Sequence, residues 1–406
     1  MRKTPDYWFM TLALVLAAMG IVMVFSASSV VACVSSEYNN DPLYFLKRQV
    51  LWTLLGLVAM VLAMRIDIHK LRKWAFPAVM LSIGMLGLVL SPHFGVVVNG
   101  ARRWLHIGPI SLQPAEFAKF GLLLYLADVL ARRGTKIKHA LRLIPLLLIF
   151  GAVVVLIEKE PDLGTAMVVA AMFFSVLWMS GAKFSHLASL AGLGVMATIM
   201  SIFKEQYRMD RMTAFLDPFK DAKGVGYHTV QSLIALGSGG VWGLGLGESR
   251  QKFLYLPEQY TDYIFAVLGE ELGLIGTLAM ILLFVCFLYK GFKIALDARQ
   301  PFMTLLAAGG TAMICFQGAL NIGVVAGALP STGVPLPFIS FGGSSLLLNM
   351  LCVGLMLNIS SYKHSRRHHR EHEGSESGLS KKSAESLGYT IAPKAYATGG
   401  PGKGWH

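Results

Sequence analysis

Long uncharged apolar runs dominate the pattern of hydrophobic and polar positions along this chain. They follow neither the period of two that is typical of a half-buried strand nor the period near four of an amphipathic helix. Runs approaching 20 residues indicate helices that cross a bilayer. The runs fall at about 8–32, 49–64, 74–91, 114–131, 143–157, 164–180, 185–203, 262–289, 302–325 and 341–359. This pattern predicts an all-α polytopic membrane protein with about ten transmembrane helices.

The composition agrees with this fold class. Of the 406 residues, 54% are hydrophobic and only 15% are charged. The first run follows Arg2 and Lys3 and resembles a signal peptide, but it is too long and lacks a small-residue cleavage site. We therefore expect an uncleaved anchor at the start of the chain.

Basic residues in the short loops predict the orientation. Lys and Arg recur at 65–73, 132–138 and 290–299, whereas the loops at 33–46 and 326–340 hold none. Because cytoplasmic loops carry the positive excess, this bias places both termini in the cytoplasm. The long loop at about 204–261, between the seventh and eighth helices, is then extracytoplasmic. The net charge of +13 is accounted for by this signal and by anionic headgroups, so no nucleic-acid partner is implied.

The polar C-terminal segment differs from the rest of the chain. We expect a transmembrane domain at 1–362 and a cytoplasmic tail at 363–406. The tail is rich in His, Ser, Gly and Lys and has little to bury, so we expect disorder. The four cysteines show no pairing or spacing typical of a metal site. We therefore predict no metal site built by the protein.

The stretch 237–265 organises the remaining polar residues. It carries six glycines between 237 and 247, then Arg250 and Lys252, and it reaches Asp262 just before the apolar run resumes. Unpaired backbone groups in hydrocarbon cost several kcal/mol each, so this loop has to lie in water or line a protected cavity. We interpret it as part of a catalytic groove at the membrane surface. The alternative for Asp262 is a cap of the helix that follows.

Two further loops contribute charged candidates. Arg102 and Arg103 lie beside Trp104, a combination that can grip phosphate or simply anchor the interface. Glu116 and Lys119 are spaced i, i+3, which favours a buried ion pair of structural or functional importance.

Three polar positions near other helices have structural alternatives. Asp162 can cap the helix that follows it, or it can be a second acid in the groove. Glu270 lies about 12 Å deeper than Asp262 along a helix, so we assign it to polar contacts inside the bundle. Ser344 follows a segment broken by prolines and glycines, and it either faces a water-filled cavity or caps a helix.

These stretches together resemble the SEDS family of shape, elongation, division and sporulation proteins. The matching segments are ARRWLHIGPISLQPAEFAK, EPDLGTA, GSGGVWGLGLGESRQKFLYLPEQYTDYIFAVLGEELG and LPSTGVPLPFISFGGSS. They occur in the family's order across nearly the whole membrane region. The form GLGESRQKFLYLPE favours the division and sporulation members over those of elongation. Tyr260 and Tyr263 depart from the family's common His and Phe, but neither departure removes an acid.

The resemblance implies a peptidoglycan glycosyltransferase that polymerises lipid II at the outer face of the bacterial cytoplasmic membrane. The family's essential acid corresponds to Asp262, which would act as general base in a single inverting displacement. The leaving pyrophosphate needs cations or polar groups to bind it. For this role we single out Arg102, Arg103, Lys119, Arg250, Lys252 and Ser344. No tightly bound cofactor is expected, although the same electrostatics allow a divalent cation, Mg²⁺ or Mn²⁺, on the pyrophosphate.

The resemblance also implies partners, a class B penicillin-binding protein and divisome proteins. Two other functions fit the polar pattern. A lipid II flippase or transporter would also use intramembrane charges and a broken helix. A scaffold that recruits a transpeptidase would use the outer motifs only as an interface. We find no internal repeat, and the polar residues concentrate on one side, which favours the polymerase.

Overall fold

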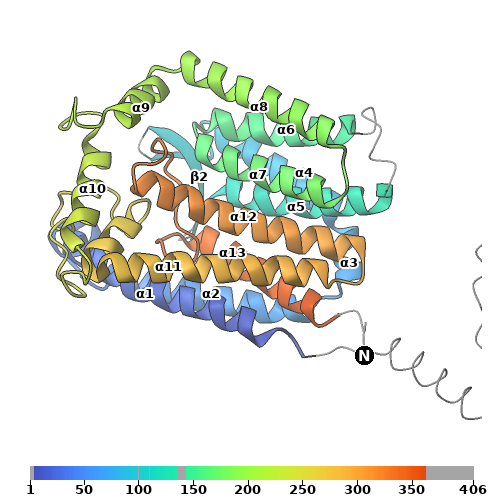
Figure 1. The fold of residues 1–406 in the computed structure, drawn as a ribbon, viewed down its shortest axis with the longest axis horizontal. Helices are drawn as coiled ribbons and strands as arrows, with labels where there is room; N and C mark the ends of the chain where they lie inside the picture. The colour runs from blue at the N-terminus through green and yellow to red at the C-terminus, as the bar shows by residue number, and fades with distance from the viewer. Residues whose placement is uncertain (1–3, 99, 109, 135–142, 363–406) are drawn as a thin grey trace, which may run out of the picture. The chain divides into compact units, whose positions relative to one another are not determined.

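The computed structural model describes residues 4–98, 100–108, 110–134 and 143–362 (Figure 1). The predicted disordered tail and the basic positions 136 and 138 lie outside the described residues. Most of the described chain is helical, and its helices belong to one compact unit, Met1–Lys363. The helices are α1 (Tyr7–Val34), α2 (Tyr44–Arg65), α3 (Ile68–Lys73), α4 (Ala75–Leu90), α5 (Pro114–Arg133), α6 (Ile144–Lys159), α7 (Leu163–Met179), α8 (Phe184–Lys204), α9 (Gln206–Leu216), α10 (Tyr227–Gly239), α11 (Ile264–Leu296), α12 (Pro301–Val325) and α13 (Gly343–Ser360), with a short 3-10 turn, η1 (Ser36–Tyr38).

Every predicted apolar run overlaps one of these helices, but the helices differ in their capacity to span a bilayer. Within the described residues, α1, α2, α8, α11, α12 and α13 are the 6 that are long and apolar enough to cross. Helices α4, α6 and α7 have only 16, 16 and 17 residues. Helix α5 has 20 residues but carries several charges. The helices expected from the apolar runs are confirmed, while the count of about ten spans stays a prediction.

A small sheet is the exception to the all-α expectation. Strands β1 (Gly95–Val98), β2 (Ala101–Ile107) and β3 (Ile110–Leu112) form an antiparallel sheet in the order β1-β2-β3. The β-branched valines of β1 favour an extended chain. Gly100 and Gly108, with φ of 77° and 62°, permit the reversals at the two ends of β2. The sheet lies at the same end of the bundle as α9 and α10, opposite α3 (Figure 1).

Helices α12 and α13 form the centre of the bundle. In the most apolar part of each, 72% and 83% of the residues are buried. Helix α12 contacts α11, α7 and α5, and α13 packs along α2. Two glycines of α12 permit its close approach to α5 and α13. A Cβ at Gly309 would collide with Leu123 of α5, and a Cβ at Gly310 would collide with Cys352 of α13. Helix α8 is peripheral, with 6% of its apolar part buried.

Helix α11 is broken near its start, which the uninterrupted apolar run did not predict. Gly273 has φ 66° and ψ −163°, so the ladder of helical hydrogen bonds is interrupted there. The glycine-rich loop after α10 inserts at the break and pairs the freed backbone groups. The four bonds are Leu244 N to Glu270 O (3.0 Å), Gly245 N to Glu271 O (3.0 Å), Leu274 N to Gly240 O (2.9 Å) and Ile275 N to Val241 O (3.3 Å).

This insertion requires glycine on both sides. A Cβ on Gly273 would lie 2.3 Å from the amide nitrogen of Gly243, and a Cβ on Gly243 would lie 2.1 Å from the carbonyl oxygen of Glu271. Gly239 makes a similar approach to the carbonyl of Gly269, at 2.1 Å. The glycines of the 237–247 stretch thus let one backbone pack directly against another, and they fix the loop that leads to Asp262.

Candidate active site

Asp262 lies where the 240–261 loop meets the first turn of α11. Two other segments hold its backbone in place. The side-chain amide of Asn321 on α12 donates to the carbonyl of Asp262 at 2.6 Å and to that of Val334 at 2.8 Å. The hydroxyl of Ser340 donates to the carbonyl of Thr261 at 2.5 Å and accepts the amide of Leu336. The proline-rich segment after α12 therefore positions the acid through main-chain contacts.

The carboxylate of Asp262 does not cap the helix, so the capping alternative is wrong. The N-cap of α11 is Tyr263, and no side chain caps it. Within the described part of the chain, no group donates a hydrogen bond to the Asp262 carboxylate. Asp162 behaves differently, because its two oxygens accept from the amide and the hydroxyl of Thr165, both at 2.9 Å, at the start of α7. The prediction that Asp162 caps this helix is confirmed.

The surroundings of Asp262 raise the pKa of its carboxyl toward neutral pH. Burial is the largest cause and raises the pKa of this carboxyl from 3.8 to about 7, with Glu258 and Asp162 adding negative charge nearby. Arg103 and Arg211 oppose the shift. The residue keeps some solvent access. A carboxyl with a pKa near the working pH and a free lone pair is suited to accept a proton.

Arg103 reaches this region from β2. Its guanidinium donates to the carbonyl of Glu160 at 2.9 Å and also to that of Pro161. Neighbouring side chains of a strand point to opposite faces, and Arg102 is accordingly exposed while Arg103 is half-buried. The structure therefore separates two arginines that the sequence suggested as one group, and Arg103 is the one whose charge acts on Asp262.

Arg211 on α9 is a site residue that sequence reasoning missed. Its guanidinium donates to the carbonyl of Ser331 at 3.1 Å, in the segment that also supports Asp262. Its charge is among those that lower the pKa of Asp262. The sequence indicated only that Arg211 is a cation in the longest loop, and this does not distinguish it from the several other cations of that loop.

Glu160 was also missed as a candidate. Its side chain is fully buried at the end of α6, and neither carboxyl oxygen has a hydrogen-bond partner in the part of the chain that the structure describes. Burial and the neighbouring Asp162 raise its pKa to about 9, against the opposing charge of Arg103. The carboxyl is therefore protonated at neutral pH. The stretch EKEPDLGTA held this acid, but nothing in its spacing indicated burial.

Lys119 and Glu116 form the expected ion pair, with Nζ and Oε1 2.7 Å apart. The two side chains are only 2% and 3% exposed. Lys119 also donates to Oε1 of Gln317 at 2.7 Å, and Gln317 donates to the carbonyl of Pro335 at 3.0 Å. In this state the pair links α5 to α12 and to the proline-rich segment. The contact of Lys119 with substrate stays a prediction.

Glu270 holds the loop before Asp262 in place through hydrogen bonds, which agrees with its assignment to polar contacts. Its carboxylate accepts from the amides of Arg250 (3.0 Å) and Gln251 (3.3 Å) and from the hydroxyls of Ser249 and Ser238. The side chain of Arg250 is exposed. Lys252 is buried instead, where it donates to the carbonyl of Gly247 and lies 3.8 Å from Glu271. Of the two predicted loop cations, Arg250 is the accessible one.

Ser344 is buried near the start of α13. Its hydroxyl accepts the amide of Gln113 at 3.2 Å, which ties α13 to the chain just before α5. The N-cap of α13 is Gly342 without a side-chain bond, so capping by Ser344 is not observed. Substrate binding by Ser344 stays a prediction.

The acids near Asp262 do not form a metal cage. Over the ranges the structure describes, no group of three or more His, Cys, Asp or Glu side chains is arranged to hold an ion. A divalent cation carried by the substrate's pyrophosphate stays a prediction.

Comparisons with known proteins agree with this architecture. A sequence model of the FtsW, RodA and SpoVE family, described as "Cell cycle protein", matches residues 6–365. "Stage V sporulation protein E" of Bacillus subtilis (strain 168) is 40% identical over 89% of this chain and 98% of its own. A "Probable peptidoglycan glycosyltransferase FtsW" of Thioalkalivibrio sulfidiphilus (strain HL-EbGR7) is 44% identical over 85% and 87%.

Solved structures show the same fold. A chain from a structure described as "Structural coordination of polymerization and crosslinking by a peptidoglycan synthase complex" is similar, with a TM-score of 0.72 and 29% identity over 89% of this chain and 98% of the other. The rod shape determining protein RodA of Thermus thermophilus gives a TM-score of 0.65 at 30% identity, over the same shares of the two chains. The chain belongs to the FtsW/RodA/SpoVE family of cell cycle proteins.

Proposed function

We propose that this chain is a peptidoglycan glycosyltransferase that polymerises lipid II. The single observation that carries the proposal is the Asp262 carboxylate, which has no hydrogen-bond donor among the described residues and a pKa raised to about 7. The names of several relatives, "Probable peptidoglycan glycosyltransferase FtsW", point to the same activity.

Asp262 acts as the general base of this reaction. It accepts the proton of the acceptor sugar's 4-hydroxyl, and the oxygen forms a bond to the anomeric carbon of the donor. The bond from that carbon to the pyrophosphate oxygen breaks on the opposite face, and its electron pair leaves with the lipid pyrophosphate. One displacement inverts the anomeric centre, so one base suffices and no covalent nucleophile is needed.

Cations near Asp262 bind the leaving group. Arg103 and Arg211 act on the acid electrostatically, and both are fixed by backbone carbonyls. A guanidinium held in place can meet developing negative charge without reorganising, which stabilises the transition state. Arg102 and Arg250 are exposed and can extend the same anion-binding site. Lys119, Lys252 and Ser344 are buried and support this site from the interior.

The membrane topology belongs to the same proposal. The chain has about ten transmembrane helices, both termini are cytoplasmic, and the active site faces outward. Helix α5 supports this orientation, because Glu116 lies in its first turn and Arg132 and Arg133 lie in its last. At 1.5 Å per residue, its 20 residues span about 30 Å, so the basic end lies roughly one bilayer core away from the Asp262 end.

A class B penicillin-binding protein and divisome proteins are the proposed partners. The solved complex to which this chain is similar couples polymerization to crosslinking, as its description states. That likeness supports a transpeptidase partner for this chain.

The test uses the purified full-length protein with its cognate transpeptidase, made inactive in crosslinking, and labelled lipid II. The expected result is glycan chains longer than one disaccharide, seen on a gel. Movement of labelled lipid II across liposome membranes without polymer would replace the proposal by a transporter. If the partner is bound but neither polymer nor movement of lipid II is detected, the scaffold function would be the one that remains.

A further inference from the structure

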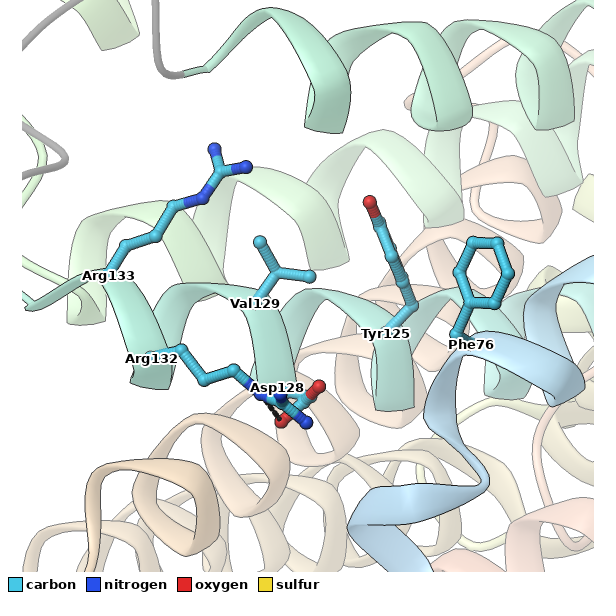
Figure 2. A pocket seen from close by; sticks show the side chains of 6 residues that line it. All are labelled: Phe76, Tyr125, Asp128, Val129, Arg132 and Arg133. Carbon is cyan, nitrogen blue, oxygen red and sulfur yellow. Dashed lines mark hydrogen bonds and ion pairs between the residues drawn. The ribbon is translucent and has the colours of Figure 1, made fainter.

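Two polar clusters lie outside the contacts that hold Asp262 in place. One lines a pocket of about 340 Å³ at the basic end of α5, and Figure 2 shows its lining. Its acid, Asp128, accepts from Nε of Arg72 at 2.5 Å and from Nε of Arg132 at 2.8 Å. These groups bind one another and join α3 to α5. The other cluster surrounds His228 of α10, and it lies beside the candidate active site.

His228 packs on the residue that follows the candidate base. It is the second residue of α10, and its ring stacks on that of Tyr263, with the ring centroids 5.6 Å apart and an interplanar angle of 22°. Tyr263 is 6% exposed and forms the N-cap of α11, directly after Asp262. The stack therefore fixes the imidazole beside the start of α11, where Asp262 lies.

The charges around His228 are also charges around Asp262. Arg211 lowers the pKa of both groups, and Glu258 raises the pKa of both. Because the interaction between charges falls with distance, both ionisable groups lie near the same two charges. His228 thus belongs to the surroundings of Asp262, although α10 supplies none of the contacts that hold the Asp262 backbone.

The imidazole of His228 is neutral at neutral pH. Burial lowers its pKa below the ordinary value of 6.5, and Arg211 lowers it further against the opposing charge of Glu258. A neutral imidazole carries its one proton on Nδ1 or on Nε2. Nδ1 is buried and has no hydrogen-bond partner among the described residues, and a buried N–H without an acceptor is costly. We therefore assign the proton to Nε2, which the half-buried ring keeps accessible.

An unpartnered ring nitrogen does not by itself make a site. His186 is half-buried as well, and its Nδ1 is also buried without a partner in the described part of the chain. It lies near the start of α8, about 22 Å along the helix from Ser201, the residue of α8 that bonds to Glu158. The features that distinguish His228 are the stack on Tyr263 and the charges that it shares with Asp262.

We propose that His228 binds the acceptor disaccharide, with Nε2–H donating a hydrogen bond to a hydroxyl oxygen of the sugar. This inference rests on the proposed function, because it assigns a further contact within the same site. A neutral donor suits an uncharged sugar oxygen, whereas the guanidiniums of Arg103 and Arg211 suit the pyrophosphate. The acceptor sugar is also the part of the substrate that has to meet Asp262, since its 4-hydroxyl gives up the proton. The contact with His228 holds that hydroxyl in place for the transfer.

The test uses three substitutions that separate the donor from the ring. Glutamine places its side-chain amide near the position of Nε2, and asparagine places it near that of Nδ1. Phenylalanine keeps an aromatic ring on Tyr263 but has no donor. His186→Phe is the matched control, because it makes the same change at a half-buried histidine remote from the site.

The measured quantity is the dissociation constant for labelled lipid II. The full-length protein is used in detergent, in the Asp262→Asn background so that no substrate is consumed, and the thermal midpoint of each variant is recorded. We expect His228→Phe and His228→Asn to raise the dissociation constant about fivefold, the loss of one hydrogen bond. His228→Gln and His186→Phe should stay within about twofold of the parent protein.

The binding measurement separates this inference from the proposed function. If the wild type makes no polymer while the variants bind lipid II as expected, the polymerase proposal fails and the contact of His228 with the lipid-linked sugar stands. If polymer forms but His228→Phe binds lipid II with the affinity of the parent, the contact is refuted and the polymerase stands.

Two further outcomes would overturn the inference. Equal losses in His228→Asn and His228→Gln would assign the effect to packing on Tyr263. An equal loss in His186→Phe would show that the change in affinity is not specific to the site. If His228→Phe does not fold, the comparison of the asparagine and glutamine variants decides, because both lack the ring and differ in where the amide lies.

Discussion

The most specific prediction concerns the pH dependence of polymerisation, which should follow the ionisation of Asp262. A general base has to be ionised, so activity is lost as pH falls through its pKa. With a pKa of about 7, the ionised fraction rises from about one-tenth at pH 6 to about nine-tenths at pH 8, a change of about ninefold in rate. A carboxyl at its ordinary pKa of 3.8 would be ionised throughout this range, and the profile would be flat.

The substitution Glu258→Gln tests the cause of this shift. Glu258 is the largest charge that raises the pKa of Asp262, after burial itself. The amide of Tyr263 donates to the carbonyl of Glu258 at 3.2 Å, so Glu258 and Asp262 belong to one turn. A unit charge at a separation of about 12 Å contributes about 1.4 kcal/mol at an effective dielectric constant of about 20. This amounts to about one pKa unit. The ionised fraction of Asp262 at pH 6 would then rise from about one-tenth to about one-half, so the variant should be about fivefold faster than the wild type at pH 6 and equal to it at pH 8.

The assay is the initial rate of lipid II polymerisation from pH 5.5 to 8.5 with the transpeptidase-inactive partner. Titration of the substrate and of the partner is common to all variants and cancels in the ratio of variant to wild type. Glu248→Gln is the matched control, because Glu248 is an exposed acid of the same loop that does not act on Asp262. A flat wild-type profile, or identical ratios for the two variants at pH 6, would refute the reasoning.

Three further predictions concern stability, each read as the thermal midpoint of the purified protein in detergent. Glu160→Gln should stabilise the protein by up to about 3 kcal/mol at pH 7, because the folded state keeps this carboxyl protonated. The pKa of Glu160 is raised from 4.5 to about 9, so the wild type loses stability as pH rises from 4.5 toward 9. A stability gain in the variant that does not shrink toward pH 4.5 would contradict this. Gly273→Ala should lower the midpoint, because φ is 66° and the new Cβ would lie 2.3 Å from the loop, whereas Gly87→Ala on α4 meets nothing within 4 Å and serves as control. Lys119→Met should cost about 3–5 kcal/mol by leaving Glu116 charged and unpaired, and adding Glu116→Gln should recover most of that loss; no recovery would exclude a charge effect.

Much of the helical framework could be predicted from the sequence, because apolar runs in a membrane protein are long and distinct. The runs at 8–32 and 302–325, for example, correspond closely to α1 and α12. The cap at Asp162 and the pair of Glu116 with Lys119 were also predictable, since both depend on neighbours three residues away. Local spacing carries this information.

Features that depend on distant backbone could not be predicted in the same way. The break at Gly273 is stable only because the 240–245 loop pairs its freed groups, and an apolar run gives no sign of that loop. The approach of Arg211 to Asp262 depends on how α9 folds back toward the proline-rich segment. The burial of Glu160 likewise depends on tertiary packing, which the spacing of EKEPDLGTA does not encode.

The most direct test of the account compares the wild type with Asp262→Asn in lipid II polymerisation, with thermal midpoint and lipid II binding measured on the same samples. Asparagine is nearly isosteric, and the contacts of the Asp262 backbone with Asn321 do not involve the side chain, so the fold and binding should be kept. Loss of the general base should reduce the rate by about 10² to 10⁴. Normal polymerisation by the folded variant would contradict the central claim, and the base would then have to be another group near the same site.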